Sequence, residues 1–334
     1  MVGAINAWNM KNILITGCAG FIGFHLSVLL LKSGYKVYGV DNLNDYYSIK
    51  LKSSRIQMLA KDDKFVFYQN DIRDMHKIKF NEKIDCVINL AAQAGVRLPR
   101  QDFNKYLSSN VDGFLSILDF CVDKGVDKIL YASSSSVYGE KNSIPFSENE
   151  PINSPKSIYA SSKIFNENLA SVYSSEFDIN LIGFRFFTVY GPWGRPDMAY
   201  FKFAESILKN ESIYLNNQGQ MSRDMTHVSD IVSGILTGLE LIFLESSKEI
   251  QSYQNLILNL GNDSPVQTLH LLETLESILG KKAKIIHAQT SNEVLSTHAD
   301  LTKAFKYLAY RPKVSFEDGL KDFVSWLLNY RDKT

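Results

Sequence analysis

The chain has 334 residues, 45% of them hydrophobic and 22% charged, which is the composition of a globular protein with room for one large domain or two. Lys plus Arg and Asp plus Glu number 36 each, so no net charge attracts nucleic acid or anionic lipid. No apolar run is long enough to span a membrane, so we expect neither a nucleic-acid nor a membrane partner.

The first apolar run, residues 13–16, is followed by three glycines and an amphipathic stretch. This is the pattern of a strand, a tight turn and a helix, in which glycine lets the backbone approach a pyrophosphate at the helix N-terminus. The glycines and the residues that begin the helix are our first candidates for cofactor binding: Gly17, Gly20, Phe21, Ile22 and Gly23.

The next apolar run, residues 37–41, ends in Asp41. A carboxylate at this strand end can accept hydrogen bonds from both ribose hydroxyls of a dinucleotide, and it would repel a 2′-phosphate. The pattern therefore favours NAD over NADP. A glycine triplet alone fits an ordinary strand–helix turn, but the acid at the next strand end makes that interpretation weaker.

Further apolar runs alternate with helical patterns, the longest of which cover residues 103–123 and 157–173. The alternation predicts an α/β fold with a Rossmann-type, doubly wound parallel sheet, and ligands of such sheets lie beyond the carboxyl ends of the strands. Each run is followed by a candidate side chain. The later runs are residues 65–68, 86–90, 128–133 and 181–186, followed by Asp71, by Ala91, Ala92 and Gln93, by the serines 133–136, and by Thr188.

The composition shifts after residue 191, where prolines and glycines punctuate a loop. We expect residues 11–190 to form the NAD-binding domain and residues 191–334 to form mainly a smaller, discontinuous α/β substrate domain. A segment near 225–262, with a strand at 256–260, would return to the first domain, and residues 316–330 would form a terminal amphipathic helix. Residues 1–10 look like a leader or an expression remnant.

Residues 159–163, Tyr-Ala-Ser-Ser-Lys, predict base chemistry on an alcohol. Positions i and i+4 share one face of a helix, so Tyr159 and Lys163 can converge on one point. The ammonium favours the phenolate, and a hydroxyl of the serine run, Ser134 above all, could share the moving proton. Such chemistry needs a hydride acceptor, which the dinucleotide turn would supply.

The three cysteines, Cys18, Cys86 and Cys121, are scattered and odd in number. They predict no disulfide framework and a reducing cytoplasm. The six histidines show no paired metal-ligand spacing, so we expect no metal site.

These motifs together resemble the extended short-chain dehydrogenase/reductase superfamily and, within it, the UDP-glucuronate 4-epimerases. The resemblance covers residues 11–330 and is carried by four strings, the most specific of which is the last: residues 41–47, 91–97, 131–139 and 185–199. It implies a hidden redox cycle. Tyr159 takes the proton of the sugar 4-hydroxyl while C4 gives its hydride to tightly bound NAD⁺, and the 4-keto sugar turns and receives the hydride on its other face.

The resemblance also implies roles residue by residue. Lys163 would favour the phenolate and bond the nicotinamide ribose, and Ser134 would bridge the substrate and Tyr159. Arg223 would bind the UDP diphosphate through its planar donor fork. The remaining implied cofactor contacts are Asp41, Asn42, Asp71, Ile72, Ala91, Ala92, Gln93, Asn110 and Ser133, and the remaining substrate contacts are Arg97, Ser135, Ser136, Thr188, Arg195 and Gln289. In folds of this kind, a helix pair such as the one predicted over residues 103–123 and 157–173 often packs against its copy in a second chain, so we expect a homodimer.

Uronate chemistry has its own constraint, because a C4-oxidised glucuronate is a β-keto acid that loses CO₂ readily. Hydroxyl donors and Arg195 could hold the carboxylate so that this bond does not align with the ketone. Related dehydratases and decarboxylases carry an acid within the segment where this chain has Ser134, Ser135 and Ser136. The chain departs from the uronate subgroup at residues 289–294, where Gln289 is kept but proline and glycine are not.

Four functions follow from the sequence. Epimerisation of UDP-glucuronate comes first, and epimerisation of a neutral or N-acetylated UDP-hexose second. A UDP-uronate decarboxylase and a non-catalytic NAD-binding sensor are the others. The complete set of Ser134, Tyr159 and Lys163 argues against the sensor, which would not need it.

Overall fold

The structure is a computed structural model that describes residues 11–140, 144–244, 255–289 and 294–332. The predicted leader, residues 1–10, lies outside the described residues. By its internal contacts the chain divides into two compact units, each built from separate segments. Unit 1 contains the chain up to Val137, Pro155–Arg185 and Val232–Leu258, and unit 2 contains Tyr138–Ser154, Phe186–Ile231 and the chain from Asn259 onward.

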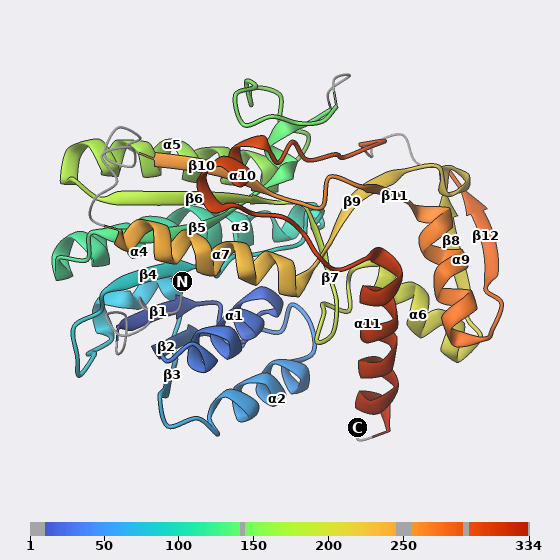
Figure 1. Ribbon diagram of the computed structural model, residues 1–334, viewed down its shortest axis with the longest axis horizontal. Helices are drawn as coiled ribbons and strands as arrows, with labels where there is room; N and C mark the ends of the chain where they lie inside the picture. Colours follow the sequence, from blue (N-terminus) through green and yellow to red (C-terminus); the bar gives the residue numbers. More distant parts are fainter. Residues whose placement is uncertain (1–10, 141–143, 245–254, 290–293, 333–334) are drawn as a thin grey trace. The chain divides into compact units, whose positions relative to one another are not determined.

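Unit 1 is built around a seven-stranded sheet in the order β10-β6-β5-β4-β1-β2-β3 (Figure 1). The four pairs β1–β2, β1–β4, β2–β3 and β4–β5 are parallel. This confirms the predicted Rossmann-type sheet, and the strand expected near 256–260 joins it as β10. The strands are β1 (Asn12–Thr16), β2 (Lys36–Asp41), β3 (Phe65–Gln69), β4 (Cys86–Asn89), β5 (Lys128–Ser134), β6 (Asn180–Phe186) and β10 (Asn255–Leu260).

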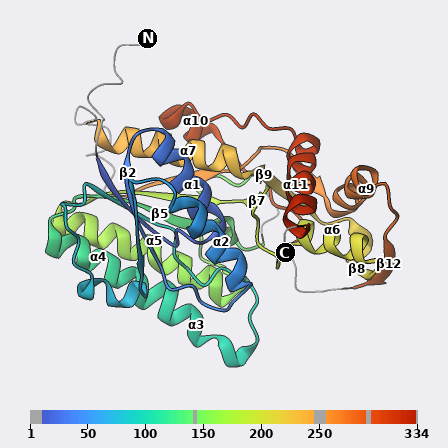
Figure 2. The same cartoon turned by 90° about the horizontal axis from the view of Figure 1, so that it is seen from below.

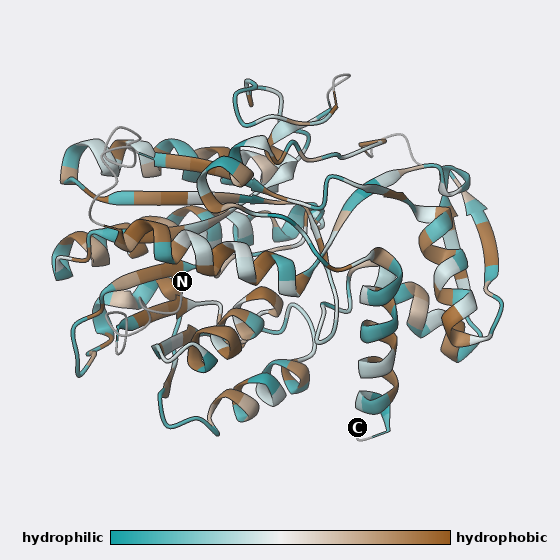
Figure 3. Cartoon of the chain, in the orientation of Figure 1, coloured by the Kyte–Doolittle hydropathy of each residue, from teal (hydrophilic) through white to brown (hydrophobic). Residues whose placement is uncertain are grey.

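Helices cover both faces of this sheet, with α1 and α7 on one face and α4 and α5 on the other (Figure 2). Hydrophobic segments, brown in Figure 3, recur along the strands of this sheet, as expected for a sheet buried on both faces. Leu14, Val87, Ile117 and Ile129 are fully buried in the core between the sheet and α4. The main helices are α1 (Phe21–Lys32), α2 (Ile49–Leu59), α4 (Gly113–Lys124), α5 (Ile158–Phe177) and α7 (Val228–Phe243), and two short helical segments are η2 (Ile72–Lys77) and η5 (Ser135–Tyr138).

The helix expected over residues 103–123 is interrupted in the structure. A short turn, η3 (Arg100–Asp102), leads into α3 (Asn104–Tyr106), and a π-helical segment, η4 (Leu107–Asp112), precedes α4. The wider turn carries Asn110, whose backbone carbonyl accepts a hydrogen bond from Asn166 Nδ2 at 2.6 Å. Such π segments inside helices occur frequently at functional sites. Apolar periodicity does not reveal this interruption, because both sides keep an inward face.

Unit 2 contains a three-stranded sheet, β11-β9-β7, and a parallel pair, β12-β8. Thr188 follows β6, as expected for the strand at 181–186, and it begins the separate short strand β7. The core of this unit includes Phe201, Leu272, Phe323 and Leu327. The elements are β7 (Thr188–Tyr190), β8 (Ser212–Asn216), β9 (Ser222–His227), β11 (Pro265–Gln267), β12 (Lys284–Ala288), α6 (Ala199–Lys209), η6 (Asn217–Gly219), α9 (Thr268–Leu279), α10 (Thr302–Leu308) and α11 (Phe316–Arg331).

The segment Tyr138–Ser154 belongs to unit 2, although the expected NAD-binding domain ran without a break to residue 190. The rings of Tyr138, Phe146 and Phe187 pack together, with the Tyr138 and Phe146 centroids 5.0 Å apart. The side chain of Asn259 donates a hydrogen bond to the Phe146 carbonyl at 2.8 Å. These long-range contacts, which no local pattern announces, hold the segment in unit 2.

Among the residues that the structure describes, no helix is both long enough and apolar enough to cross a membrane.

Candidate nucleotide-binding and catalytic site

The strand order reverses between β1 and β4, and in open sheets of this kind ligands bind beyond the carboxyl ends at such a point. The turn after β1 and the loop after β4 touch each other there. A Cβ on Gly17 would lie only 2.8 Å from the Ala91 backbone nitrogen, and Gly17 has φ of +74°. Only glycine meets both constraints, so the predicted Gly17 and Ala91 are brought together at the reversal point.

The other two glycines let α1 begin directly against this turn. A Cβ on Gly23 would lie 2.1 Å from the Gly17 carbonyl oxygen, and one on Gly20 would lie 2.9 Å from it. Phe21 and Ile22 are the first residues of α1, where backbone N–H groups lack partners within the helix. The turn and the helix start therefore form a cradle in which backbone N–H groups can bind an anion such as a pyrophosphate.

Asp41 lies at the end of β2 and is directed at the same turn. Its carboxylate accepts hydrogen bonds from the backbone N–H of Ala19 at 3.1 Å and of Leu43 at 2.8 Å. Burial raises the pKa of Asp41, and the backbone hydrogen bonds and the nearby Lys52 and Arg55 oppose that rise. Arg55 also donates to the Ala19 carbonyl at 2.6 Å, so two charged side chains hold the turn in place.

Asn42 and Asp71, two further predicted cofactor contacts, are hydrogen-bonded to each other. Asn42 Nδ2 donates to Asp71 Oδ2 at 3.0 Å, and Arg73 donates to both oxygens of Asp71. The bonds from Arg73 lower the pKa of Asp71 to about 2. Ile72, which follows, is buried at the start of η2. The carboxylate of Asp71 is thus charged at neutral pH and fixed beside the end of β2.

Gln93 and Asn110 also lie together. Asn110 Oδ1 accepts the backbone N–H of Gln93 at 2.8 Å, and Asn110 Nδ2 donates to Ser162 Oγ at 2.9 Å. Gln93 is only 5% exposed, and among the described residues none accepts a hydrogen bond from its Nε2. A buried donor without a partner is costly and points to a bound group that completes it. This donor, the glycine cradle and Asp41 together fit a dinucleotide.

Arg97 is exposed on the loop that follows Gln93. Tyr106 fixes this loop, because its hydroxyl donates to the Gly95 carbonyl and accepts the Leu98 N–H at 3.1 Å. Tyr106 also stands beside Tyr159, with ring centroids 6.1 Å apart. Arg97 is therefore presented by a loop that is anchored next to the predicted base.

Tyr159 and Lys163 converge as the i, i+4 spacing predicts. Helix α5 begins at Ile158, where Ser157 Oγ accepts the Ala160 N–H at 3.1 Å. Lys163 Nζ lies 6.0 Å from the centroid of the Tyr159 ring and donates to the Ala132 carbonyl at 2.8 Å. Lys163 is 3% exposed, and burial lowers its pKa to about 8 against the raising effect of Glu167. The ammonium is thus held in the interior beside the phenol ring.

The serine run divides into a buried part and an accessible part. Ser133 is buried and donates to Glu167 Oε1 at 2.5 Å. Ser134 Oγ accepts hydrogen bonds from the backbone N–H and the hydroxyl of Ser136, at 3.2 and 2.9 Å. Ser134, Ser135 and Ser136 are partly exposed. A hydroxyl of this group can therefore meet a ligand, whereas the Ser133 hydroxyl is committed to Glu167.

Two buried charged residues next to this site were missed in the sequence reasoning. Glu167 lies one turn beyond Lys163 on α5, and Arg185 near the end of β6 binds it through two hydrogen bonds of 2.9 and 2.7 Å. The i, i+4 series Tyr159, Lys163 and Glu167 is a signal that could have found the acid. No local pattern pairs it with Arg185.

The other predicted substrate residues lie in unit 2. Arg195 forms two hydrogen bonds with Asp197, of 3.0 and 2.6 Å. Arg223, on β9, donates to the Ser222 carbonyl at 2.8 Å. Thr188 is partly exposed at the start of β7. Trp193, for which both a sugar contact and loop packing are reasonable roles, has its ring 5.3 Å from that of Trp326 in α11.

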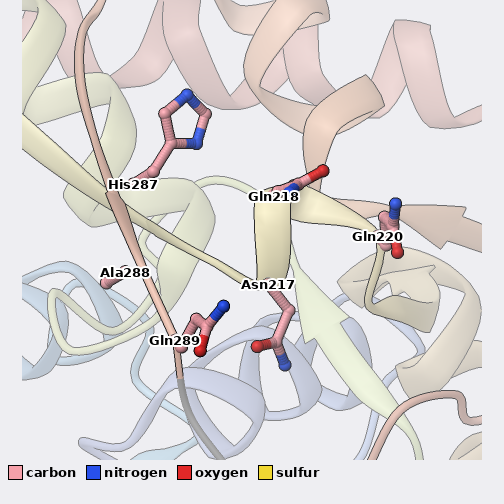
Figure 4. A pocket seen from close by; sticks show the side chains of 6 residues that line it. All are labelled: Asn217, Gln218, Gln220, His287, Ala288 and Gln289. Carbon is pink, nitrogen blue, oxygen red and sulfur yellow. The ribbon is translucent and has the colours of Figure 1, made fainter.

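Gln289 lines a cavity of about 320 Å³ in unit 2 (Figure 4). One side of the cavity is formed by η6, which follows β8, and by Gln220 directly after it. The other side is formed by the end of β12 and by Gln289, which follows that strand. Its lining is made of carboxamides, an imidazole and a methyl group, without a charged side chain: Asn217, Gln218, Gln220, His287, Ala288 and Gln289. Such a lining offers both donors and acceptors to a neutral polar group.

The glycine cradle, the acid at the next strand end and the Tyr159–Lys163 pair on one sheet define a dinucleotide-dependent short-chain dehydrogenase/reductase. Residues 13–251 match the NAD dependent epimerase/dehydratase family, and the chain belongs to this family. An uncharacterized protein of Methanocaldococcus jannaschii is 46% identical to this chain, and the match covers 96% of this chain and 98% of that protein. UDP-glucuronate 4-epimerase 4 of Arabidopsis thaliana is 41% identical over 96% of this chain and 76% of its own.

The fold is also similar to a solved structure. The crystal structure of UDP-glucuronic acid 4-epimerase from Bacillus cereus, in complex with UDP-glucuronic acid and NAD, has a TM-score of 0.85 and 34% identity. The similarity covers 96% of this chain and 100% of that one.

The close approach at the glycine turn gives a direct prediction for Gly23→Ala. The new Cβ would collide with the Gly17 carbonyl oxygen, so the turn must open and bound NAD should be lost. A loss of binding energy above about 1.4 kcal/mol lowers the affinity for NAD more than tenfold. The NAD released from heat-denatured protein, measured by chromatography, should therefore fall clearly below one per chain. Val28→Ala, a partly exposed site on the same helix, should retain NAD. Full NAD content in the Gly23→Ala protein would contradict the assignment of the cradle.

Proposed function

We propose that this protein is an NAD-dependent 4-epimerase of UDP-sugars and that its substrate pair is UDP-glucuronate and UDP-galacturonate. The observation that carries the proposal is the Tyr159–Lys163 pair, which holds an ammonium next to a phenol in the same unit as the glycine cradle. The relatives support it, because the Arabidopsis thaliana relative and the Bacillus cereus structure both carry the name of a UDP-glucuronate 4-epimerase.

The residues that would hold NAD are those of the cradle and its neighbours. Gly17, Gly20 and Gly23 would give the pyrophosphate its backbone donors, and Asp41 would accept the adenosine ribose hydroxyls. Asp71 and Ile72 would flank the adenine, Asn42 would contact the cofactor next to its partner Asp71, and Gln93 would donate its unpartnered Nε2. Bound NAD⁺ would supply the acceptor for the C4 hydride and would return that hydride later in the same cycle.

Tyr159 is the residue that moves the proton. Its phenolate would take the proton of the sugar 4-hydroxyl as the C–O bond becomes a carbonyl, and the phenol would return that proton when the alcohol re-forms. The Lys163 ammonium favours the phenolate by its charge, and the Ala132 carbonyl keeps it in place. The Ser134 hydroxyl would pass the hydrogen bond between the sugar oxygen and Tyr159. The proton ends where it began, so a single base is sufficient for both directions.

Unit 2 would bind the nucleotide part. Arg223 would contact the diphosphate, since its fork of donors matches phosphate oxygens. The carboxamide-lined cavity with Gln289 would receive an uncharged polar part of the nucleoside, which both donates and accepts hydrogen bonds. This side of the site differs from the uronate subgroup at residues 290–293, which lie outside the described residues.

The preference for a uronate would come from hydroxyls and one guanidinium. Ser134, Ser135, Ser136 and Thr188 would donate to the carboxylate, and Arg195 would neutralise it by exchanging its bond with Asp197 for one with the substrate. The serine segment offers no carboxylic acid that could act in elimination. The intermediate would therefore be held rather than decarboxylated.

A second candidate is epimerisation of a neutral or N-acetylated UDP-hexose. The observation that favours it is the two-bond pairing of Arg195 with Asp197, which already neutralises the charge of the guanidinium. If this pair stays closed when substrate binds, Arg195 gives no preference for a carboxylate.

The chemistry is tested by proton NMR of the purified protein with UDP-glucuronate and no added NAD. The anomeric signal of UDP-galacturonate should appear, and Tyr159→Phe should abolish it while NAD remains bound, because the proton acceptor is lost. Conversion of UDP-glucose or UDP-N-acetylglucosamine alone would establish the second candidate, and a UDP-pentose would establish a decarboxylase. Unchanged turnover in Tyr159→Phe would remove Tyr159 as the base.

Arg195→Ala tests the origin of uronate preference. Loss of one charge-assisted contact of about 1.5–3 kcal/mol should weaken UDP-glucuronate binding by roughly 10- to 100-fold. Binding of UDP-glucose, measured by calorimetry in the same buffer, should change by less than about threefold, which is under 1 kcal/mol. Equal losses for both ligands would make Arg195 a nucleotide or structural residue.

We also propose that the protein is a homodimer through α4 and α5, which pack together in unit 1. Ile158, Phe165 and Val172 recur every seven residues along α5 and are 36–47% exposed, and Leu115 on α4 is 38% exposed. An apolar stripe at this spacing fits the same stripe of a second copy. Light scattering should give twice the chain mass, and Phe165→Glu should give a monomer. A monomeric unaltered protein would overturn the proposal.

The cytoplasm is the compartment that we propose. Its support is that Cys18, Cys86 and Cys121 are all free and buried, and burial raises the pKa of each thiol. Thiols of this kind suit a reducing environment.

A further inference from the structure

Helix α5 carries a third polar side chain in line with the Tyr159–Lys163 pair. Tyr159, Lys163 and Glu167 are spaced four residues apart, so they lie on one face of the helix. Glu167 is 5% exposed. The motif of residues 159–163 ends at the lysine, and the function proposed above gives Glu167 no role.

Glu167 is bound on both oxygens. Arg185 donates to Oε1 at 2.9 Å through Nε and to Oε2 at 2.7 Å through Nη2, and Ser133 adds a hydrogen bond of 2.5 Å to Oε1. Arg185 is 3% exposed, so both charges are inside the protein. Because removing two ions from water costs as much as their attraction returns, such a pair is weak evidence for a role in stability. The position of the Glu167–Arg185 pair next to the proposed site suggests a different role.

That position is the end of β5. The Ala132 carbonyl accepts the bond from Lys163, and the next residue, Ser133, gives its hydroxyl to Glu167. Two consecutive residues of the strand are thus attached to α5 at points one helical turn apart. Ser134 follows immediately, so its position relative to Tyr159 depends on these two attachments.

We propose that Glu167, fixed by Arg185, is a positioning residue of the epimerase reaction, which holds the end of β5 against α5 and keeps Lys163 in its ammonium form. The proposal rests on the proposed function for its catalytic meaning. Its structural part, the control of Lys163 by the acid one turn away, can be measured without turnover.

The charges around Lys163 give the sign of the effect. Tyr159 and Glu167 on α5 act on Lys163 directly. Arg185 on β6 and Tyr131 on β5 interact with Glu167. Burial lowers the pKa of Lys163 to about 8, and the negative charge of Glu167 opposes this. Lys163 is an ammonium below that pKa and loses its charge as the pH rises through it. Activity that needs the ammonium should therefore fall on the alkaline side.

Glu167→Gln is the first test, because it keeps the shape and removes the charge. In a plot of kcat against pH, the alkaline limb should move to lower pH. A shift of about one pH unit corresponds to a tenfold lower kcat on that limb. The KM for the UDP-sugar and the content of bound NAD should remain within about twofold, since Glu167 is buried and bonded to Ser133 and Arg185. Glu176→Gln removes an exposed carboxylate from the same helix and should leave the profile unchanged.

Arg185→Gln is the opposing test, because it leaves the charge of Glu167 uncompensated. The alkaline limb should move to higher pH, opposite to the shift in Glu167→Gln. A merely structural pair would lower activity in both variants without moving the limb. If either single variant does not fold, the double variant Glu167→Met, Arg185→Met replaces both charged side chains by apolar ones, a change that proteins often tolerate. The alkaline limb of its kcat–pH profile should also move to lower pH.

The pKa of Lys163 should also be followed directly, by NMR titration of its ¹³Cε signal in protein labelled at lysine. A lower pKa in Glu167→Gln supports the inference even if no UDP-sugar is turned over, in which case only the proposed function fails. An unchanged Lys163 pKa and an unchanged limb in folded variants would overturn the inference, whatever the substrate.

Discussion

The proposed chemistry depends on how α5 is attached to the end of β5. Lys163 is buried, and its ammonium is stabilised by one carbonyl of the strand, one acid of its own helix and the face of Tyr159. An ammonium in such a place would favour the phenolate that the proposed function requires, because opposite charges stabilise each other more strongly in a buried site. Each contact is made from regular secondary structure, which holds a site more accurately than a loop does.

A second constraint is the close contact of backbones at the reversal of the sheet. The loops after β1 and β4 meet at a distance that admits no side chain, and α1 begins directly above them. Asp41 and Arg55 fasten the same turn from the next strand and helix. The place where a dinucleotide would lie is therefore formed by backbone that is fixed before any ligand arrives, which lowers the cost of ordering on binding.

Much of this arrangement could be predicted from the sequence, because its signals are local. The glycine spacing, Asp41 after the second apolar run and the four-residue step from Tyr159 to Lys163 each follow from one element or one turn. The π-helical turn at Asn110, the packing of Phe146 with Phe187 and the pairing of Glu167 with Arg185 could not be predicted. Each joins residues that are far apart in the chain or depends on a break that apolar periodicity does not record. Arg195 could be predicted as a candidate substrate contact, but its hydrogen bonds to Asp197 could not be predicted. The roles of the individual site residues stay predictions.

In the proposed reaction, C4 of the sugar is oxidised and reduced again by the same enzyme-bound carrier. This redox cycle is tested most directly with UDP-glucuronate that carries deuterium at C4, incubated with the purified protein in ordinary water and analysed by NMR and mass spectrometry. We expect UDP-galacturonate with the deuterium still on C4, because the hydride never exchanges with solvent. Product in which C4 carries hydrogen from water would contradict it, since that outcome requires removal of a proton rather than a hydride.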